Sequence, residues 1–128
     1  MPCRRRGHRA RLLPLAAAAL VLCGGCGDTE PTTVVRGDRV TVTLDDFRFE
    51  PQAIRARSGR ISFALRNRGR LAHTFRLRIQ GRPVVEVPSM LPGEGATQAA
   101  RLPRGNYRIF CALANHEELG MYGTLTLR

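Results

Sequence analysis

The chain has 128 residues, of which 43% are hydrophobic and 24% are charged, a composition that is ordinary for one globular domain and unlike that of a disordered chain. Its formal net charge is +11, but five arginines lie in the first 26 residues, so the remainder carries 16 arginines against 10 acidic residues, a net charge of +6. Aromatic residues make up only 5% of the chain, and we expect no nucleic-acid binding from a chain that is only moderately basic after residue 26.

Residues 1–26 have the features of an export signal. A basic segment precedes an apolar run, residues 12–22, that is too short to span a bilayer as a helix and suits a secretory signal peptide. The following CGGCG resembles the cleavage site of bacterial lipoproteins, with Cys26 as the lipidated residue; lipidation of Cys23 and ordinary signal cleavage are the alternatives. We therefore expect a protein at the outer face of the cytoplasmic membrane or in the periplasm, held to the membrane by a lipid anchor.

Residues 27–37 are polar and are expected to form a flexible tether, and the folded domain is expected to span residues 38–128. Within this domain, apolar and polar residues alternate in short runs separated by turn residues, the pattern of half-buried strands. Residues 45–51 are expected to form a turn. Seven or eight such runs with little helical pattern predict an all-β fold, a Greek-key β-sandwich.

Cys111 is the only thiol that remains once the leader is removed and Cys26 is linked to lipid. An unpaired thiol in an oxidising compartment is prone to oxidation unless something occupies it, and metal ligation is a direct explanation. His116 and Met121 follow Cys111, with four residues between each pair. Strand alternation places Cys111 on the face of the apolar residues before it and Met121 in register with the leucines after it, so both point inward.

A fourth ligand is expected from His73, because the chain has only three histidines and His8 lies in the leader. His73 begins an alternating run, HTFRLRI, in which it shares a face with the apolar residues. Thiolate, imidazole and thioether donors select copper over hard cations, and two His, one Cys and a weak axial Met are the pattern of an electron-transfer copper site. We expect one copper ion bound by His73, Cys111, His116 and Met121.

The residues around these ligands resemble the cupredoxin family of small type 1 blue copper proteins. The LPRGNY sequence at 102–107 and the ligands that follow it are similar to the C-terminal half of that family, and residues 47–51, 59–67 and His73 to its N-terminal half. The resemblance covers residues 38–128. It implies that Tyr107 forms a tyrosine corner, and that Thr74 and Asn115 support the site through hydrogen bonds to the Cys111 sulfur.

Three functional classes are compatible with such a site: a one-electron carrier, a protein that stores or delivers copper, and a cupredoxin interaction module without redox activity. The complete ligand set favours the carrier, which we expect to be a monomer that serves redox partner proteins. We expect no enzymatic activity, because a trinuclear copper cluster needs more histidines than the two outside the leader. Zinc also suits a site with one Cys and two His.

The loop between Cys111 and Met121 is expected to face the redox partner. His116 lies there among apolar residues and is the expected electron port, while Glu117 and Glu118 are expected to be exposed charges that face the partner. Nine arginines and no acidic residue lie between positions 51 and 85, which predicts one basic region on the surface.

Overall fold

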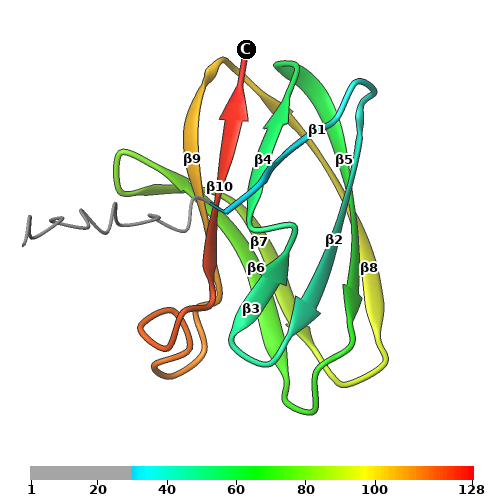
Figure 1. The fold of residues 1–128 in the computed structure, drawn as a ribbon, viewed down its shortest axis with the longest axis vertical. Helices are drawn as coiled ribbons and strands as arrows, with labels where there is room; N and C mark the ends of the chain where they lie inside the picture. Colours follow the sequence, from blue (N-terminus) through cyan, green and yellow to red (C-terminus); the bar gives the residue numbers. More distant parts are fainter. Residues whose placement is uncertain (1–29) are drawn as a thin grey trace, which may run out of the picture.

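The protein forms two packed β-sheets in the computed structural model, which describes residues 30–128 (Figure 1). The larger sheet has six strands, in the order β1 (Thr32–Val34), β4 (Ala53–Ala56), β10 (Tyr122–Leu127), β9 (Gly105–Phe110), β6 (His73–Ile79) and β7 (Arg82–Met90). The smaller has four, in the order β3 (Arg48–Glu50), β2 (Arg39–Asp45), β5 (Gly59–Asn67) and β8 (Gly95–Leu102). The predicted all-β sandwich is confirmed.

The expected signal peptide and the lipidation site Cys26 lie outside the described residues. Within residues 30–128, no helix is long and apolar enough to cross a membrane.

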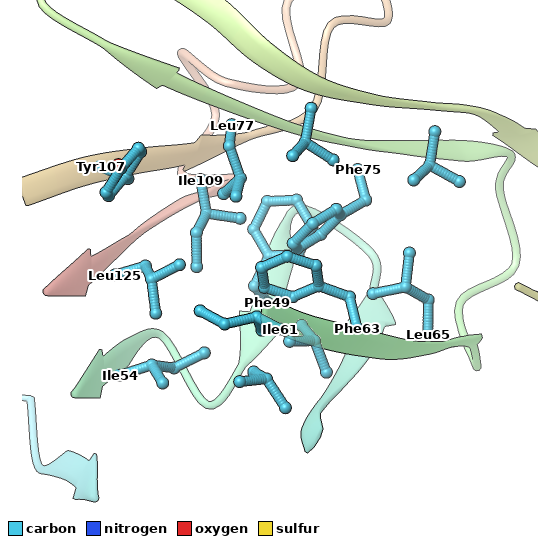
Figure 2. Packing of buried hydrophobic residues seen from close by; sticks show 14 of the residues in the cluster. Phe49, Ile54, Ile61, Phe63, Leu65, Phe75, Leu77, Tyr107, Ile109 and Leu125 are labelled. Atoms are coloured by element: carbon cyan, nitrogen blue, oxygen red, sulfur yellow. The ribbon is translucent and has the colours of Figure 1, made fainter. Parts of the chain in front are cut away.

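Strand alternation produces the core. In β5, the side chains of Ile61, Phe63 and Leu65 point inward while their neighbours are partly or fully exposed, as the sequence pattern predicts. Three phenylalanines from different parts of the chain meet between the sheets (Figure 2): the Phe75 ring lies 5.2 Å from that of Phe63 and 6.0 Å from that of Phe49, measured between centroids. Burial of each such side chain stabilises the fold by roughly 1.5–3 kcal/mol.

Ten strands are present in the described residues, rather than the seven or eight expected, because two strands of three residues each lie in segments that were expected to be a tether and a turn. β1 lies within the expected tether, where all three of its side chains are exposed and its main chain pairs in parallel with β4. Part of the segment expected to be flexible therefore belongs to the sheet, and the domain begins before Asp38. β3 lies within the expected 45–51 turn, and it pairs antiparallel with β2 so that Phe49 is fully buried opposite Leu44.

The arginines between positions 51 and 85 are divided between the two sheets, since they occur on β4, β6 and β7 of the larger sheet and on β5 of the smaller one. Some are neutralised by ion pairs, as Arg76 is by Glu86 at 3.4 Å. The expectation of a single basic region is therefore wrong, because sequence proximity does not place strands of opposite sheets on the same surface.

Three turns that are distant in the sequence meet at one end of the sandwich, the lower end in Figure 1. They are the β2–β3 turn, the β5–β6 turn and the long β9–β10 loop. Backbone hydrogen bonds join the first two turns, since the N–H of Arg68 donates to the Leu44 carbonyl at 2.8 Å. The side chains that these turns carry form the candidate site.

Candidate metal centre

His73, Cys111 and His116 converge at this end of the sandwich. His73 is the first residue of β6, Cys111 directly follows β9, and His116 lies in the β9–β10 loop. One ligand atom from each residue lies within 4.8 Å of the others. The Nδ1 atom of His116 is 3.2 Å from Nδ1 of His73 and 3.5 Å from Sγ of Cys111, so two imidazole nitrogens and one sulfur face a common point.

Burial keeps this cluster away from water. His73 is fully buried and Cys111 is 1% exposed, while His116 is half-buried at the surface. Burial lowers the pKa of His73 below its ordinary 6.5, and the nearby His116 adds to this effect, while the hydrogen bond to Asp46 opposes it only in part. His73 is therefore neutral at neutral pH, the form that can bind a metal.

Met121 closes the base of the ligand loop. Its backbone N–H donates to the His116 carbonyl at 2.9 Å, and its own carbonyl accepts a hydrogen bond from the Cys111 N–H at 3.2 Å. These two bonds place Met121 beside Cys111, with its side chain fully buried. The inward direction predicted from strand alternation for both Cys111 and Met121 is confirmed.

Thr74 contacts the Cys111 sulfur with both its backbone and its side chain. The Thr74 N–H donates to Sγ at 3.4 Å, and its hydroxyl lies 3.6 Å from Sγ while accepting the Ala112 N–H at 2.8 Å. The supporting role expected for Thr74 therefore has a direct geometric basis. The alternation of β6 places Thr74 on the outer face of the sheet, where a side chain would ordinarily be exposed. Thr74 is nevertheless buried, because the ligand loop, which begins at Cys111, covers it.

Asn115 contributes to the ligand loop through its backbone. Its side chain is exposed, and its backbone carbonyl accepts a hydrogen bond from the Leu119 N–H at 3.1 Å, which makes it part of the turn. The hydrogen bonds to the Cys111 sulfur that the described residues show come from Thr74, so a contribution of Asn115 to the sulfur stays a prediction.

Glu117 also departs from expectation, because it is partly buried in an ion-pair network. Its carboxylate accepts hydrogen bonds from Arg78 on β6, and a further one from Nε of Arg108 on β9 at 2.9 Å. Burial raises the pKa of Glu117, but these two guanidinium groups outweigh it and hold the pKa below its ordinary value. Glu117 therefore fastens the ligand loop to the sheet, while Glu118 is exposed as expected.

The β2–β3 turn contacts both histidines, and sequence reasoning missed this contribution. Oδ1 of Asp46 lies 3.2 Å from Nε2 of His73, on the side of the ring away from the cluster. The neighbouring Phe47 packs edge to face on the His116 ring, with centroids 5.1 Å apart. Phe47 has a φ of 58°, in the left-handed region that non-glycine residues rarely adopt, so the turn accepts an unfavourable conformation where it contacts the site.

The tyrosine corner implied by the resemblance is confirmed. The Tyr107 hydroxyl donates to the Pro103 carbonyl at 2.7 Å, and the ring is 2% exposed. This bond braces β9 at the end opposite the ligand loop. Tyr107 is therefore a structural residue, as expected.

The donor set of His73, Cys111 and His116 fits one copper ion. A thiolate and two neutral imidazoles are ligands that copper prefers, and the three residues come from a strand edge and a braced loop. Asp46 contacts His73 at Nε2, on the side of the ring away from the other two ligands, so it adds no oxygen donor to the group.

Comparison with solved structures identifies the fold. A dithionite-reduced auracyanin from the photosynthetic bacterium Roseiflexus castenholzii is 13% identical, with a TM-score of 0.66 over 73% of this chain and 99% of that one. Auracyanin A, a "blue" copper protein from Chloroflexus aurantiacus, is 15% identical, with a TM-score of 0.59 over 70% and 99%. Reduced rusticyanin is 16% identical, with a TM-score of 0.59 over 76% and 84%.

Larger enzymes also contain this fold, since a multicopper oxidase and a copper nitrite reductase from Thermus scotoductus match over 41% and 28% of their own chains. No family model matches the sequence, and no curated protein matches it.

Proposed function

We propose, from the cupredoxin fold that this chain has, that the protein binds one copper ion in a type 1 site and carries one electron at a time. The observation that supports this most directly is the convergence of ligand atoms of His73, Cys111 and His116 within 4.8 Å of one another, with His73 and Cys111 buried and His116 half-buried. Met121, fully buried beside Cys111, is proposed as the weak axial ligand.

The protein supplies a site that changes little when its charge changes. Bound copper would provide a one-electron couple between its two oxidation states. His73 is held by β6, Cys111 by β9 and by Thr74, and the loop between Cys111 and Met121 is closed by the backbone bonds described above. Such fixed ligands keep the rearrangement on electron transfer small.

We further propose His116 as the electron port, because it is the ligand that reaches the surface. Exposed apolar side chains occur on the turns at this end of the molecule, and such a surface allows a redox partner to approach closely. They include Leu71, Leu91 and Leu119, which are 43%, 58% and 53% exposed.

The proposed location is outside the cytoplasm, with a membrane anchor at Cys26 and redox proteins as partners of a monomer. The sequence of residues 1–26 supports export, and the single unpaired thiol at Cys111 among the described residues is protected by burial and metal binding. Mass spectrometry of protein extracted from membranes tests this part, since acylation at Cys26 adds a lipid mass to the N-terminal peptide. A mature N-terminus without lipid would refute the anchor.

Addition of Cu(II) to the purified protein tests the metal site. We expect an intense thiolate-to-copper absorption band in the red region and a narrow copper hyperfine splitting, and we expect Cys111→Ser to lose both. Mixtures of reduced and oxidised protein should then show fast electron self-exchange by NMR line broadening. A colourless copper complex, or a blue complex with Cys111→Ser, would refute the site; a blue protein with slow exchange would indicate storage rather than electron transfer.

A further inference from the structure

We propose that Asp46 is a positioning residue, which fixes the ring of His73 as a metal ligand and lowers the reduction potential of the copper site. The potential rests on the proposed function, whereas the orientation of His73 is a property of the metal-free protein. Asp46 precedes His73 by 27 residues and reaches it from the β2–β3 turn.

The geometry assigns the two ring nitrogens of His73 to different partners. Nε2 lies 3.2 Å from Oδ1 of Asp46, while Nδ1 faces His116 at 3.2 Å. The His73 side chain is 0% exposed, so water does not compete with Asp46 for Nε2. Because a carboxylate only accepts hydrogen bonds, Nε2 carries the proton, and Nδ1 is left with the lone pair that a metal requires.

Asp46 is itself held in place by the turn before β6. Its Oδ1 also accepts the backbone N–H groups of Arg70 at 2.9 Å and Leu71 at 3.2 Å. The buried Asn67 fixes this turn from within, since its amide donates to the Leu71 carbonyl at 2.8 Å and accepts the Gly69 N–H at 2.9 Å. The carboxylate therefore cannot move away from His73 without losing two further hydrogen bonds.

Gly69 has no side chain, and this leaves room for the contact between Asp46 and His73. A Cβ at this position would lie 2.5 Å from Oδ1 of Asp46 and 3.0 Å from Nε2 of His73. Both distances are too short for a side chain to be added without displacing one of the two groups. The absence of a side chain at position 69 is thus a second, independent sign that the Asp46–His73 contact is built into the turn.

A carboxylate behind a ligating imidazole orients the ring and makes it a stronger electron donor. The oxidised copper ion, which has the higher charge, gains more from a stronger donor than the reduced ion does. Asp46 should therefore favour Cu(II) over Cu(I), which lowers the reduction potential.

The charge can be separated from the hydrogen bonds with Asp46→Asn, which keeps an oxygen for the turn N–H groups but removes the negative charge. We expect its potential to rise relative to the unmodified protein, by about 59 mV for each tenfold loss of Cu(II) over Cu(I) affinity, and its Cu(II) binding to weaken about ten- to a hundredfold. Asp45→Asn is the matched control, because Asp45 carries the same charge one residue away and its carboxylate, among the described residues, accepts one hydrogen bond, from the Asp46 N–H at 2.8 Å.

The orientation of His73 is tested without copper. In the metal-free protein, imidazole ¹⁵N shifts should show a single tautomer of His73 with the proton on Nε2, and Asp46→Ala and Gly69→Ala should both release it to a mixture. Retention of the single tautomer in Asp46→Ala, or a potential in Asp46→Asn no higher than in Asp45→Asn, would overturn the proposal. If the unmodified protein forms no blue site, the proposed function fails, and the ¹⁵N measurement still decides the role of Asp46.

Discussion

Replacement of Thr74 by Val removes one of the two hydrogen bonds to the Cys111 sulfur while it preserves the shape of the side chain. The hydroxyl lies 3.6 Å from Sγ and accepts the Ala112 N–H at 2.8 Å, and both contacts are lost when a methyl group takes its place. The backbone bond from the residue 74 N–H to Sγ, at 3.4 Å, remains.

The magnitude follows from the charge on the sulfur. A hydrogen bond to a charged group contributes about 1.5–3 kcal/mol, and the long contact to Sγ belongs at the low end of that range. The sulfur is more negative when the copper is reduced, so the hydroxyl stabilises the reduced state more than the oxidised one. If about 1 kcal/mol distinguishes the two states, the potential of Thr74→Val falls by roughly 40 mV, since 59 mV corresponds to a tenfold change for one electron.

Cyclic voltammetry of the copper-loaded protein measures this shift, and Thr74→Ser, which retains the hydroxyl, serves as the matched control. Urea unfolding of the metal-free variants should show that Thr74→Val is also less stable, by about 1–2 kcal/mol, because the Ala112 N–H has lost its acceptor. A potential for Thr74→Val that equals or exceeds that of Thr74→Ser would refute the reasoning.

Other changes probe the scaffold. Gly123→Ala places a Cβ against the Gln52 carbonyl oxygen, closer than van der Waals contact allows, so we expect a loss of about 3 kcal/mol in the free energy of unfolding in urea. Gly37→Ala, with open space around it, should change little, and equal losses would contradict this. Tyr107→Phe removes the hydrogen bond to the Pro103 carbonyl and keeps the ring, so it should lower the free energy of unfolding by about 1 kcal/mol in the same measurement. An unchanged free energy of unfolding would contradict this. The unfolded chain protonates His73 more readily than the folded one, so the metal-free protein should lose stability as the pH falls below 6.5; a His73→Gln variant that loses as much between pH 7.5 and 5.5 would refute this assignment.

The sequence was sufficient for those features that depend on local periodicity. Alternation placed Cys111 and Met121 inward, and elimination among three histidines identified His73, because both arguments need only the chain near each residue. The tyrosine corner at Tyr107 was accessible for the same reason, since its acceptor lies four residues upstream.

Contacts between distant turns were not accessible in this way. Asp46 was read as part of a turn because its partner, His73, is 27 residues away and only the folded sandwich brings the β2–β3 and β5–β6 turns together. Glu117 was expected to be exposed because its partners Arg78 and Arg108 lie on strands that are adjacent only in the sheet.

The pairing of β1 with β4 also matters for any shortened form of the protein. A fragment that starts at Asp38, the boundary that the sequence indicates, would lack β1 and leave the outer backbone groups of β4 without partners. Unpaired strand edges recruit strands from other molecules, so that fragment should self-associate at concentrations where a fragment beginning at Glu30 stays dispersed.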